Sequence, residues 1–202
     1  MNCVALIPIK ARRQCKSRLA SVLDAYERQD LARWMLSRVL QVARASSRIS
    51  QIIVISPERD DLEGVNVIQD TGTDLNGALQ CGRDWCARSS QDPILVLAAD
   101  LPFLTAVELD DFICASLKVG VGIATDRAGQ GTNALLLGQP STFKFHFGPD
   151  SRAGHEAEAS RLGVRPIVRQ TPGLAMDVDE PEDLNRIRRG VRIPFQCGNS
   201  TW

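Results

Sequence analysis

The sequence has no excess charge of either sign. Its 24 lysines and arginines balance its 24 aspartates and glutamates, so the formal net charge of the 202 residues is zero. Without a net charge, the molecule as a whole has no electrostatic field that would attract nucleic acid or an anionic membrane surface. We therefore expect neither nucleic acid nor a membrane among its partners.

Long apolar runs and zinc-binding patterns are also missing. No apolar stretch approaches the roughly 18 residues that are needed to span a bilayer, and no signal-peptide pattern precedes the first strand-like segment. None of the six cysteines forms a C-x-x-C pair, and His146 and His155 do not complete a zinc pattern. We expect a cytoplasmic protein whose thiols are reduced.

Two common nucleotide-binding patterns are absent from the loop after the first strand-like segment. The Walker A pattern G-x-x-x-x-G-K-[ST] does not occur there, and neither does G-x-G-x-x-G. The second absence disfavours a dinucleotide-binding Rossmann domain. A hydride-transferring oxidoreductase is therefore the least favoured class of enzyme.

What the sequence does contain is the composition of a folded protein, with 44% apolar and 24% charged residues. Its length fits one domain with a sizeable core. No internal repeat and no low-complexity linker divides it. We expect a single domain over residues 1–190, followed by an irregular tail over residues 191–202.

Short apolar runs alternate with longer amphipathic ones along this domain. Strands are expected over residues 3–9, 51–56, 65–69, 94–99, 119–125, 132–137 and 164–168. Helices are expected over residues 31–42, 76–88, 107–117, 151–162 and 181–189. This alternation predicts an α/β fold, in which a mainly parallel sheet has helices on both faces. Ligands of such sheets gather at the carboxyl ends of the strands.

A cluster of five cations follows the first predicted strand. Lys10, Arg12, Arg13, Lys16 and Arg18 stand there with no acid among them. A strand-to-helix loop with this charge suits a triphosphate, because the charge of a triphosphate must be neutralised before another phosphate can approach. The alternative interpretation is a solvated surface run.

Aspartates stand in two segments that are distant in the sequence but can line the same cleft. Asp100 ends an apolar strand, while Asp177 and Asp179 alternate along an extended stretch and can face the same way. Together they predict a Mg²⁺ site, because Mg²⁺ is usually held by one or two carboxylates with phosphates and water. Asp100 could instead cap backbone N–H groups. For Glu182 and Asp183, the preferred role is capping at the N-terminus of the helix that Pro181 opens.

Three further segments offer polar groups to a ligand. Two glycines precede Thr132 and so allow backbone amides to approach an anion. Gly148 allows close approach, and Ser151 opens a helix, where it can cap the helix or bind a phosphate. Asp74 or Asn76 can cap another helix or read the purine edge of a nucleotide, since a carboxylate can accept both N–H groups of guanine.

These segments together resemble the CofC/FbiD family of guanylyltransferases, which act in the biosynthesis of the deazaflavin coenzyme F-420. The resemblance covers residues 3 to about 189. It is carried by I-P-I-K and K-S-R-L-A within 7–20, S-P at 56–57, D-L-N-G-A-L at 74–79, A-D-L-P at 99–102, G-T-N-A-L-L at 131–136, F-G-P-D-S at 147–151 with a histidine at 155, and D-V-D-E-P-E-D-L at 177–184. A-D-L-P alone recurs in other nucleotidyltransferases, whereas the combination is much more specific.

The resemblance implies a three-layer α/β/α domain like that of the GT-A nucleotide-diphospho-sugar transferases, with a mixed, mostly parallel sheet. It also implies a Mg²⁺-dependent reaction, in which GTP and a phosphorylated three-carbon acid give a guanylyl diphospho-acid and pyrophosphate. Members of the family use 2-phospho-L-lactate, phosphoenolpyruvate or 3-phospho-D-glycerate. Which of these acids is the acceptor here is left open.

The resemblance also implies roles for individual residues. The implied metal ligands are Asp100, Asp177 and Asp179, with the choice between the last two left open. The implied GTP-binding residues are Lys10, Lys16, Arg18, Asp74, Asn76 and Asp100. Of these, the implied catalytic residues are Asp100, Lys10, Lys16 and Arg18. The implied contacts to the phospho-acid are Thr132, Gly148 and Ser151.

Two other functions fit the same segments. A nucleotidyltransferase of the same fold could act on a molybdopterin or a sugar phosphate, and pyrophosphate release with a panel of acceptors would separate these activities. A non-catalytic protein on the same scaffold would bind GTP without turnover, although the retained carboxylates argue against it. The oligomeric state is left open, with a homodimer as one candidate.

Overall fold

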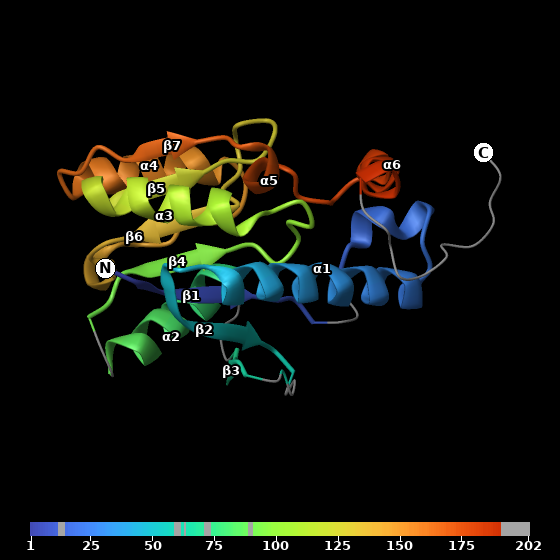
Figure 1. Cartoon of the computed structure of the whole chain (residues 1–202), viewed down its shortest axis with the longest axis horizontal. Coiled ribbons are helices and arrows are strands. Elements are labelled where there is room, and N and C mark those ends of the chain that lie inside the picture. The colour runs from blue at the N-terminus through green and yellow to red at the C-terminus, as the bar shows by residue number, and fades with distance from the viewer. Residues whose placement is uncertain (12–14, 59–61, 63, 71–73, 89–90, 191–202) are drawn as a thin grey trace.

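The computed structural model describes residues 1–11, 15–58, 62, 64–70, 74–88 and 91–190. In this part of the chain, seven strands form one sheet (Figure 1). They are β1 (Cys3–Pro8), β2 (Ile49–Ser56), β3 (Asn66–Gln69), β4 (Ile94–Leu97), β5 (Val121–Ala124), β6 (Ala134–Leu137) and β7 (Ile167–Arg169). Each of the seven predicted strands overlaps one of them, although most of the observed strands are shorter.

Helices connect these strands. The α-helices of the described residues are α1 (Ala25–Ala45), α2 (Leu75–Ala87), α3 (Ala106–Val119), α4 (Ser151–Arg161), α5 (Pro172–Ala175) and α6 (Pro181–Gly190). Two short 3₁₀ helices join them there, η2 (Ser17–Ser21) and η3 (Pro140–Thr142). The sequence pattern predicts α1 to α4 and α6, but it does not predict α5, which is a single turn.

The strands lie in the order β3-β2-β1-β4-β6-β5-β7. Only β6 runs antiparallel to its neighbours among these strands, so the sheet is mixed and mostly parallel. In the ladder, Ala134 at the start of β6 pairs with Leu97 at the end of β4 and with Ala124 at the end of β5. The reversed direction of β6 therefore brings its first residues to the edge where the parallel strands end.

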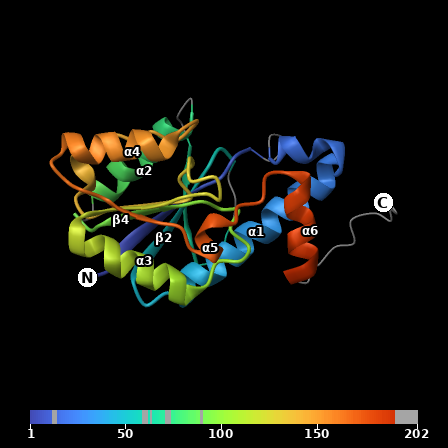
Figure 2. The same ribbon diagram turned by 90° about the horizontal axis from the view of Figure 1, so that it is seen from above.

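The sheet is the middle of three layers (Figure 2). Helices α1 and α3 cover one face, where Val39, Phe112 and Ile113 belong to one apolar cluster with residues of the strands. Helices α2 and α4 cover the other face, where Leu79 and Ala159 belong to a second cluster. Because both faces are covered, β4 is buried at every position.

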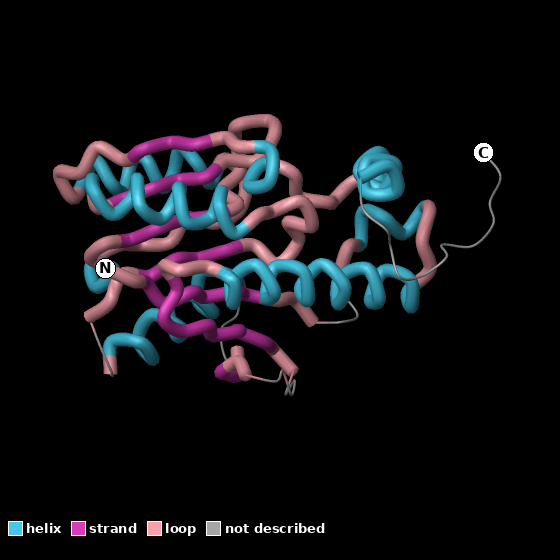
Figure 3. The backbone as a smooth tube through the Cα atoms, viewed as in Figure 1, coloured by secondary structure: helices cyan, strands magenta, loops and turns pink. Residues whose placement is uncertain are grey.

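A third apolar cluster lies beyond the sheet. Leu19 of η2, Met35 of α1 and Ile187 of α6 are fully buried in it. Figure 3 shows η2 and α6 side by side beyond one end of the sheet, and Figure 1 shows that the arrow of β2 points toward this end. Lys16, which stands directly before η2, and the acids directly before α6 are therefore anchored at the carboxyl ends of the strands.

Helix boundaries follow local capping chemistry. Thr105 caps α3, because its hydroxyl accepts the Glu108 N–H. The predicted strand over 119–125 is wrong at its start: α3 continues through Val119, and Gly120 ends the helix at φ 94°. A left-handed glycine is a common helix stop, and it overrides the strand preference of the valine before it.

Two features bear on the environment of the chain. Within the part of the chain that the structure describes, no helix combines the length and the apolar character needed to cross a bilayer. The cysteines of this part form no disulfide with one another; they are Cys3, Cys15, Cys81, Cys86 and Cys114. The expected cytoplasmic location stays a prediction.

An ion pair on α4 between the buried Glu158 and the half-exposed Arg161 leads to a prediction about stability and pH. Glu158 accepts hydrogen bonds from Arg161 at 2.7 and 2.8 Å and from the Lys144 N–H at 2.9 Å. The hydrogen bonds from Arg161 are the main cause that lowers the pKa of Glu158 from 4.5 to about 2. The folded state therefore favours the ionised form of Glu158. The resulting stabilisation of the fold is present above pH 4.5 and is lost as the pH falls toward 2.

We therefore expect Glu158→Gln to lower the urea midpoint of unfolding at pH 7, with a difference from wild type that shrinks below pH 4.5. The matched control is Glu156→Gln, because the Glu156 side chain is 37% exposed and its pair with Arg152 is solvated. Equal urea midpoints for Glu158→Gln and wild type at pH 7 would show that the Glu158 carboxylate does not stabilise the fold.

Candidate functional site

The predicted site residues come together at the carboxyl edge of the sheet. Asp100 follows the end of β4 by three residues, and Thr132 and Asn133 stand directly before β6. The main chain of Asn133 joins two strands there: its carbonyl accepts the Ala98 N–H, and its N–H donates to the Ala124 carbonyl, both at 2.8 Å. This edge is where ligands of open α/β sheets bind.

Lys16 connects two acidic segments at this edge. Its Nζ lies 2.5 Å from Asp100 Oδ2 and 2.8 Å from Asp179 Oδ1. These residues are 84 and 163 positions away from Lys16 in the chain. The Lys16 side chain is 9% exposed, so its charge is held by the two carboxylates rather than by water. The expected convergence of Asp100 with a late aspartate is therefore present.

The backbone of Lys16 has an unusual conformation. Its φ is 50° and its ψ is 44°, which is the left-handed region that non-glycine residues rarely adopt. This conformation costs about 1 to 2 kcal/mol in a residue with a side chain. The two ion pairs offset that cost and direct the ammonium group inward.

The three aspartates have different electrostatic environments. Burial raises the pKa of Asp177 to about 6, with the negative charge of Asp100 as the next cause, although Asn133 opposes this by donating to Asp177 Oδ1 at 3.2 Å. Burial also raises the pKa of Asp179, but the charges and hydrogen bonds of its cationic neighbours, Lys16 foremost, lower it on balance. Asp177 therefore faces negative charge, and no cation among the described residues forms an ion pair with it.

Asp183 holds the main chain on which Asp179 lies. Its Oδ2 accepts the N–H of Asp179 at 3.1 Å and the N–H of Glu180 at 2.9 Å, so the predicted capping role of Asp183 is confirmed. Its Oδ1 accepts from Arg186 at 2.8 Å and pairs with Arg127 at 2.9 Å. The start of α6 is thus tied to the loop before β6. Glu182 is exposed.

Two of the predicted cations lie at the rim of this acidic group. The Arg18 side chain is 68% exposed, and its Nη1 lies 3.3 Å from Glu180 Oε1 and 3.9 Å from Asp179 Oδ2. Lys10 is exposed, and its charge contributes to the lowered pKa of Asp179. The predicted Arg12 and Arg13 lie outside the described residues. Lys10 and Arg18 remain accessible to an anion from solvent.

The aspartates fit a magnesium ion by their chemistry. Mg²⁺ prefers carboxylate oxygens and commonly takes only one or two of them, with phosphates and water completing its shell. Asp100 and Asp179 already hold one positive charge between them, that of Lys16. Among the described residues, no three acidic, histidine or cysteine side chains are gathered closely enough to hold a metal by themselves. Magnesium binding therefore stays a prediction that depends on substrate phosphates.

The predicted phospho-acid contacts lie beside α4. Thr132 and Ser151 are buried, with 8% and 3% exposure, whereas Gly148 is exposed and has a φ of 134°. Capping by the Ser151 side chain is wrong, because the N-cap of α4 is Asp150 and it makes no side-chain capping bond. The first turn of α4 thus lacks a side-chain cap, and binding of the acid by these residues stays a prediction.

The predicted base-reading residues make local structural contacts. Asp74 caps α2, since its Oδ1 accepts the Gly77 N–H at 2.9 Å. The Asn76 amide donates to the Phe147 carbonyl at 2.9 Å, and its oxygen accepts the Phe147 N–H at 2.8 Å. Asn76 thereby fixes the segment before Gly148. Recognition of guanine by Asp74 and Asn76 stays a prediction.

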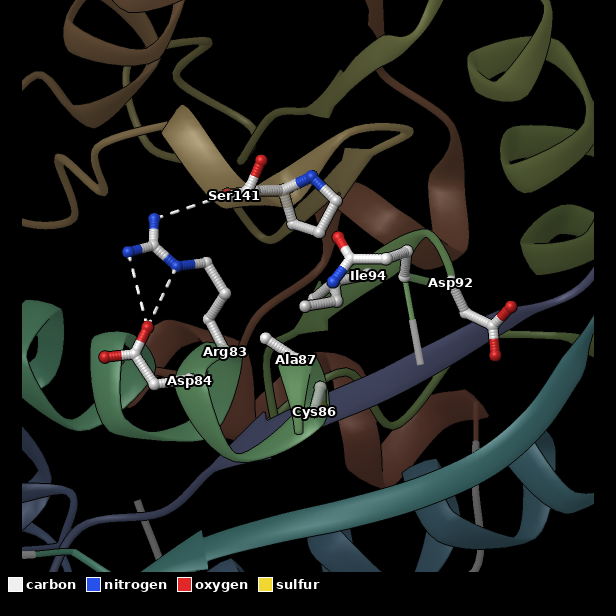
Figure 4. Close-up of a pocket in the computed structure, with 9 residues that line it drawn as sticks. Arg83, Asp84, Cys86, Ala87, Asp92, Ile94 and Ser141 are labelled. Atoms are coloured by element: carbon white, nitrogen blue, oxygen red, sulfur yellow. Dashed lines mark hydrogen bonds and ion pairs between the residues drawn. The ribbon is translucent and has the colours of Figure 1, made fainter. Parts of the chain in front are cut away.

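A hollow of about 110 Å³ opens at the opposite end of the sheet (Figure 4). It lies beside Ile94, at the start of β4, and its lining includes Arg83 and Asp84. Figure 4 shows Arg83 between Asp84 and the segment of Ser141. Pockets for drug-sized ligands usually measure about 300 to 1,000 Å³. The hollow is too small for a nucleotide, so the candidate site remains at the carboxyl edge.

Some contacts that shape the site are not predicted by local patterns. Asn133 Nδ2 donates both to Asp177 and to the Leu174 carbonyl, at 3.2 and 3.0 Å. The link of Asp183 to Arg127 spans two segments that are far apart in the sequence. The motifs G-T-N-A-L-L and D-V-D-E-P-E-D-L contain Asn133 and Asp183, but nothing in them shows which residue meets which.

The sequence matches the family described as "Guanylyl transferase CofC like" over residues 3–189. The chain belongs to this family. Its curated relatives include the phosphoenolpyruvate guanylyltransferase of Chloroflexus aurantiacus, which is 40% identical over 96% of this chain and 97% of the relative. They also include the 2-phospho-L-lactate guanylyltransferase of Methanothermobacter thermautotrophicus, which is 32% identical over 93% of this chain and 84% of the relative.

A solved structure shows the same architecture. A Desulfovibrio desulfuricans protein described as a nucleotide-diphospho-sugar transferase superposes with a TM-score of 0.75, over 94% of this chain and 87% of that protein. Its sequence identity is 15%, so the likeness shows the fold alone. The expected three-layer fold of the GT-A type, with its mixed and mostly parallel sheet, is therefore confirmed.

Proposed function

We propose that this CofC-like protein transfers GMP from GTP to the phosphate of a phosphorylated three-carbon acid and releases pyrophosphate. The observation that carries the proposal is the meeting of Asp100 and Asp179 around the Lys16 ammonium, with Asp177 beside them. Acidic groups that can hold a cation thus stand next to basic groups that can hold phosphates. The guanylyltransferases at 30–40% identity support the same reaction class.

The chemistry requires two anions to meet. A phosphate oxygen of the acid attacks the α-phosphorus of GTP, a P–O bond forms, and the bond to the β-phosphate oxygen breaks to release pyrophosphate. Charge repulsion and alignment are the main barriers to this step. When bound, Mg²⁺ would polarise the phosphoryl oxygens and neutralise the charge that develops on them.

We assign the metal to Asp100 with Asp177 or Asp179. The raised pKa of Asp177 supports a role for this residue, because a carboxylate that faces other negative charges gains most from a nearby cation. Lys16, with the exposed Lys10 and Arg18, would bind the triphosphate and stabilise the departing pyrophosphate. Asp74 and Asn76 would contact the guanine, and Thr132, Gly148 and Ser151 would bind the acid.

One experiment tests the reaction and the acceptor together. Purified protein is incubated with GTP, Mg²⁺ and one of 2-phospho-L-lactate, phosphoenolpyruvate or 3-phospho-D-glycerate, and the products are identified by mass. We expect a guanylyl diphospho-acid and one equivalent of pyrophosphate with at least one acid. CTP in place of GTP, and a sugar 1-phosphate in place of the acid, are the controls. A product with the sugar phosphate alone would favour the other nucleotidyltransferase activity, and GTP binding without product would favour the non-catalytic protein.

The magnesium requirement has its own test. We expect EDTA to stop product formation and added Mg²⁺ to restore it, because the acidic group and the triphosphate repel each other without a cation between them. Full activity in EDTA would contradict the assignment of the aspartates. The role in coenzyme F-420 biosynthesis and the homodimer stay predictions.

A further inference from the structure

His155 is a buried histidine with a defined set of neighbours. It lies on α4 and has no exposed surface. Its ring meets the Phe147 ring edge-on, with 4.7 Å between the centroids, and the Phe143 ring is 6.1 Å away. Packing against these aromatic rings limits the movement of the imidazole. Each of its two ring nitrogens then has a separate hydrogen-bond partner.

The hydrogen-bond partners determine which nitrogen carries the proton. The main-chain N–H of His146 donates to Nε2 at 3.0 Å, so Nε2 must be the unprotonated nitrogen. Burial, with the charge of His146 as a smaller cause, lowers the pKa of His155 to about 4, and the ring is therefore neutral at neutral pH. A neutral imidazole has one N–H group, which here must be on Nδ1.

This tautomer sets the role of Thr132. His155 Nδ1 lies 3.0 Å from Thr132 Oγ1, so the Nδ1–H donates and the hydroxyl oxygen accepts. The hydroxyl proton cannot also be donated to His155 and must point elsewhere. Among the residues that the structure describes, the Thr132 hydroxyl makes no hydrogen bond to a further acceptor. Because Thr132 is 8% exposed, a ligand is the natural acceptor for a donor that is largely removed from water.

Thr132 lies close to the proposed site of transfer. The next residue, Asn133, donates to Asp177, and the loop before Thr132 is tied to α4 because the Gln130 carbonyl accepts the Arg152 N–H at 3.0 Å. We propose that His155 is a positioning residue that holds the Thr132 hydroxyl as a hydrogen-bond donor to the phospho-acid. This inference rests on the proposed function, which gives the acid as the ligand of Thr132.

Two amide substitutions separate this role from a purely structural one. In His155→Asn, the side-chain amide nitrogen stands near the former Nδ1, so the donor to Thr132 is kept and the acceptor of the His146 N–H is lost. In His155→Gln, the amide oxygen reaches the former Nε2, so the acceptor of the His146 N–H is kept and the donor to Thr132 is lost. The two variants therefore each remove one of the two hydrogen bonds.

The expected readout is a selective change in KM. We expect His155→Gln to raise KM for the phospho-acid about three- to tenfold, as for one lost hydrogen bond, with KM for GTP unchanged. His155→Asn should leave KM for the acid within about twofold of wild type, although it lowers the melting temperature. In a Thr132→Val background, which lacks the hydroxyl, His155→Gln should no longer change KM for the acid.

Equal effects of the two variants on KM for the acid, or a His155→Gln effect that persists in Thr132→Val, would overturn the proposal. A measurement on the unmodified protein keeps the proposal testable where a variant does not fold. Nitrogen-15 NMR of histidine-labelled protein should show the Nδ1–H tautomer for His155, and an Nε2–H tautomer would refute it. If the Nδ1–H tautomer is found but no acid is turned over, the proposed function has failed, and the assignment of the Thr132 proton to the acid fails with it.

Discussion

Replacing Asp100 by asparagine is expected to lower kcat for GMP transfer at least a hundredfold while the protein stays folded. The side chain keeps its volume, but the negative charge next to the transferred phosphoryl group is lost. A loss of about 3 kcal/mol of transition-state stabilisation is typical when one preorganised electrostatic partner is removed. The measurement is the rate of pyrophosphate release with saturating GTP, acid and Mg²⁺.

The fold should tolerate this change because the Asp100 side chain is 27% exposed and Lys16 keeps its pair with Asp179. Asp84→Asn is the matched control, since the Asp84 side chain is 60% exposed and lies at the opposite end of the sheet. It should release pyrophosphate at the wild-type rate. Near-normal transfer by Asp100→Asn would exclude Asp100 as a metal ligand. An equal loss of kcat in Asp84→Asn would show that the effect of Asp100→Asn is not specific to the site.

Lys16→Met is expected to reduce kcat by about two to three orders of magnitude. The ammonium group that meets both Asp100 and Asp179 is the most buried of the three described cations of the site, and a methionine of similar length cannot neutralise phosphate charge. The free energy of unfolding should change much less than the activation free energy. The two carboxylates are 27% and 43% exposed, so water can solvate them when their partner is removed.

A second substitution distinguishes charge from backbone geometry at this position. Because Lys16 has a φ of 50°, Lys16→Gly removes the backbone strain together with the ammonium group, whereas Lys16→Met removes the ammonium group alone. We expect both variants to lose transfer to a similar extent. Lys144→Met, at an exposed position outside the site, is the control. If Lys16→Gly kept most of the transfer activity, the missing charge could not be the cause of the activity loss in Lys16→Met.

The local patterns of the sequence were sufficient for the seven strands and for α1 to α4 and α6 in their order along the chain, but not for the single turn α5. Strand β4 is buried at all four positions, and the run Ile94–Leu97 has no polar residue that would allow another environment. Thr105 with Glu108 is a short-range capping pattern that is visible in the sequence, and it begins α3. Asp100 lies three residues after the end of the apolar strand β4, so its place at the carboxyl edge also follows from nearby residues.

The tertiary structure alone decided which residues meet. Lys16, Asp100 and Asp179 are brought together only because β1 and β4 are neighbours in the sheet and α6 packs on η2. The reversal of β6 brings Thr132 to the same edge, and the tautomer of His155 follows from one main-chain N–H of another segment. Periodicity and capping act over a few residues, whereas strand order and long-range hydrogen bonds depend on how the whole chain packs.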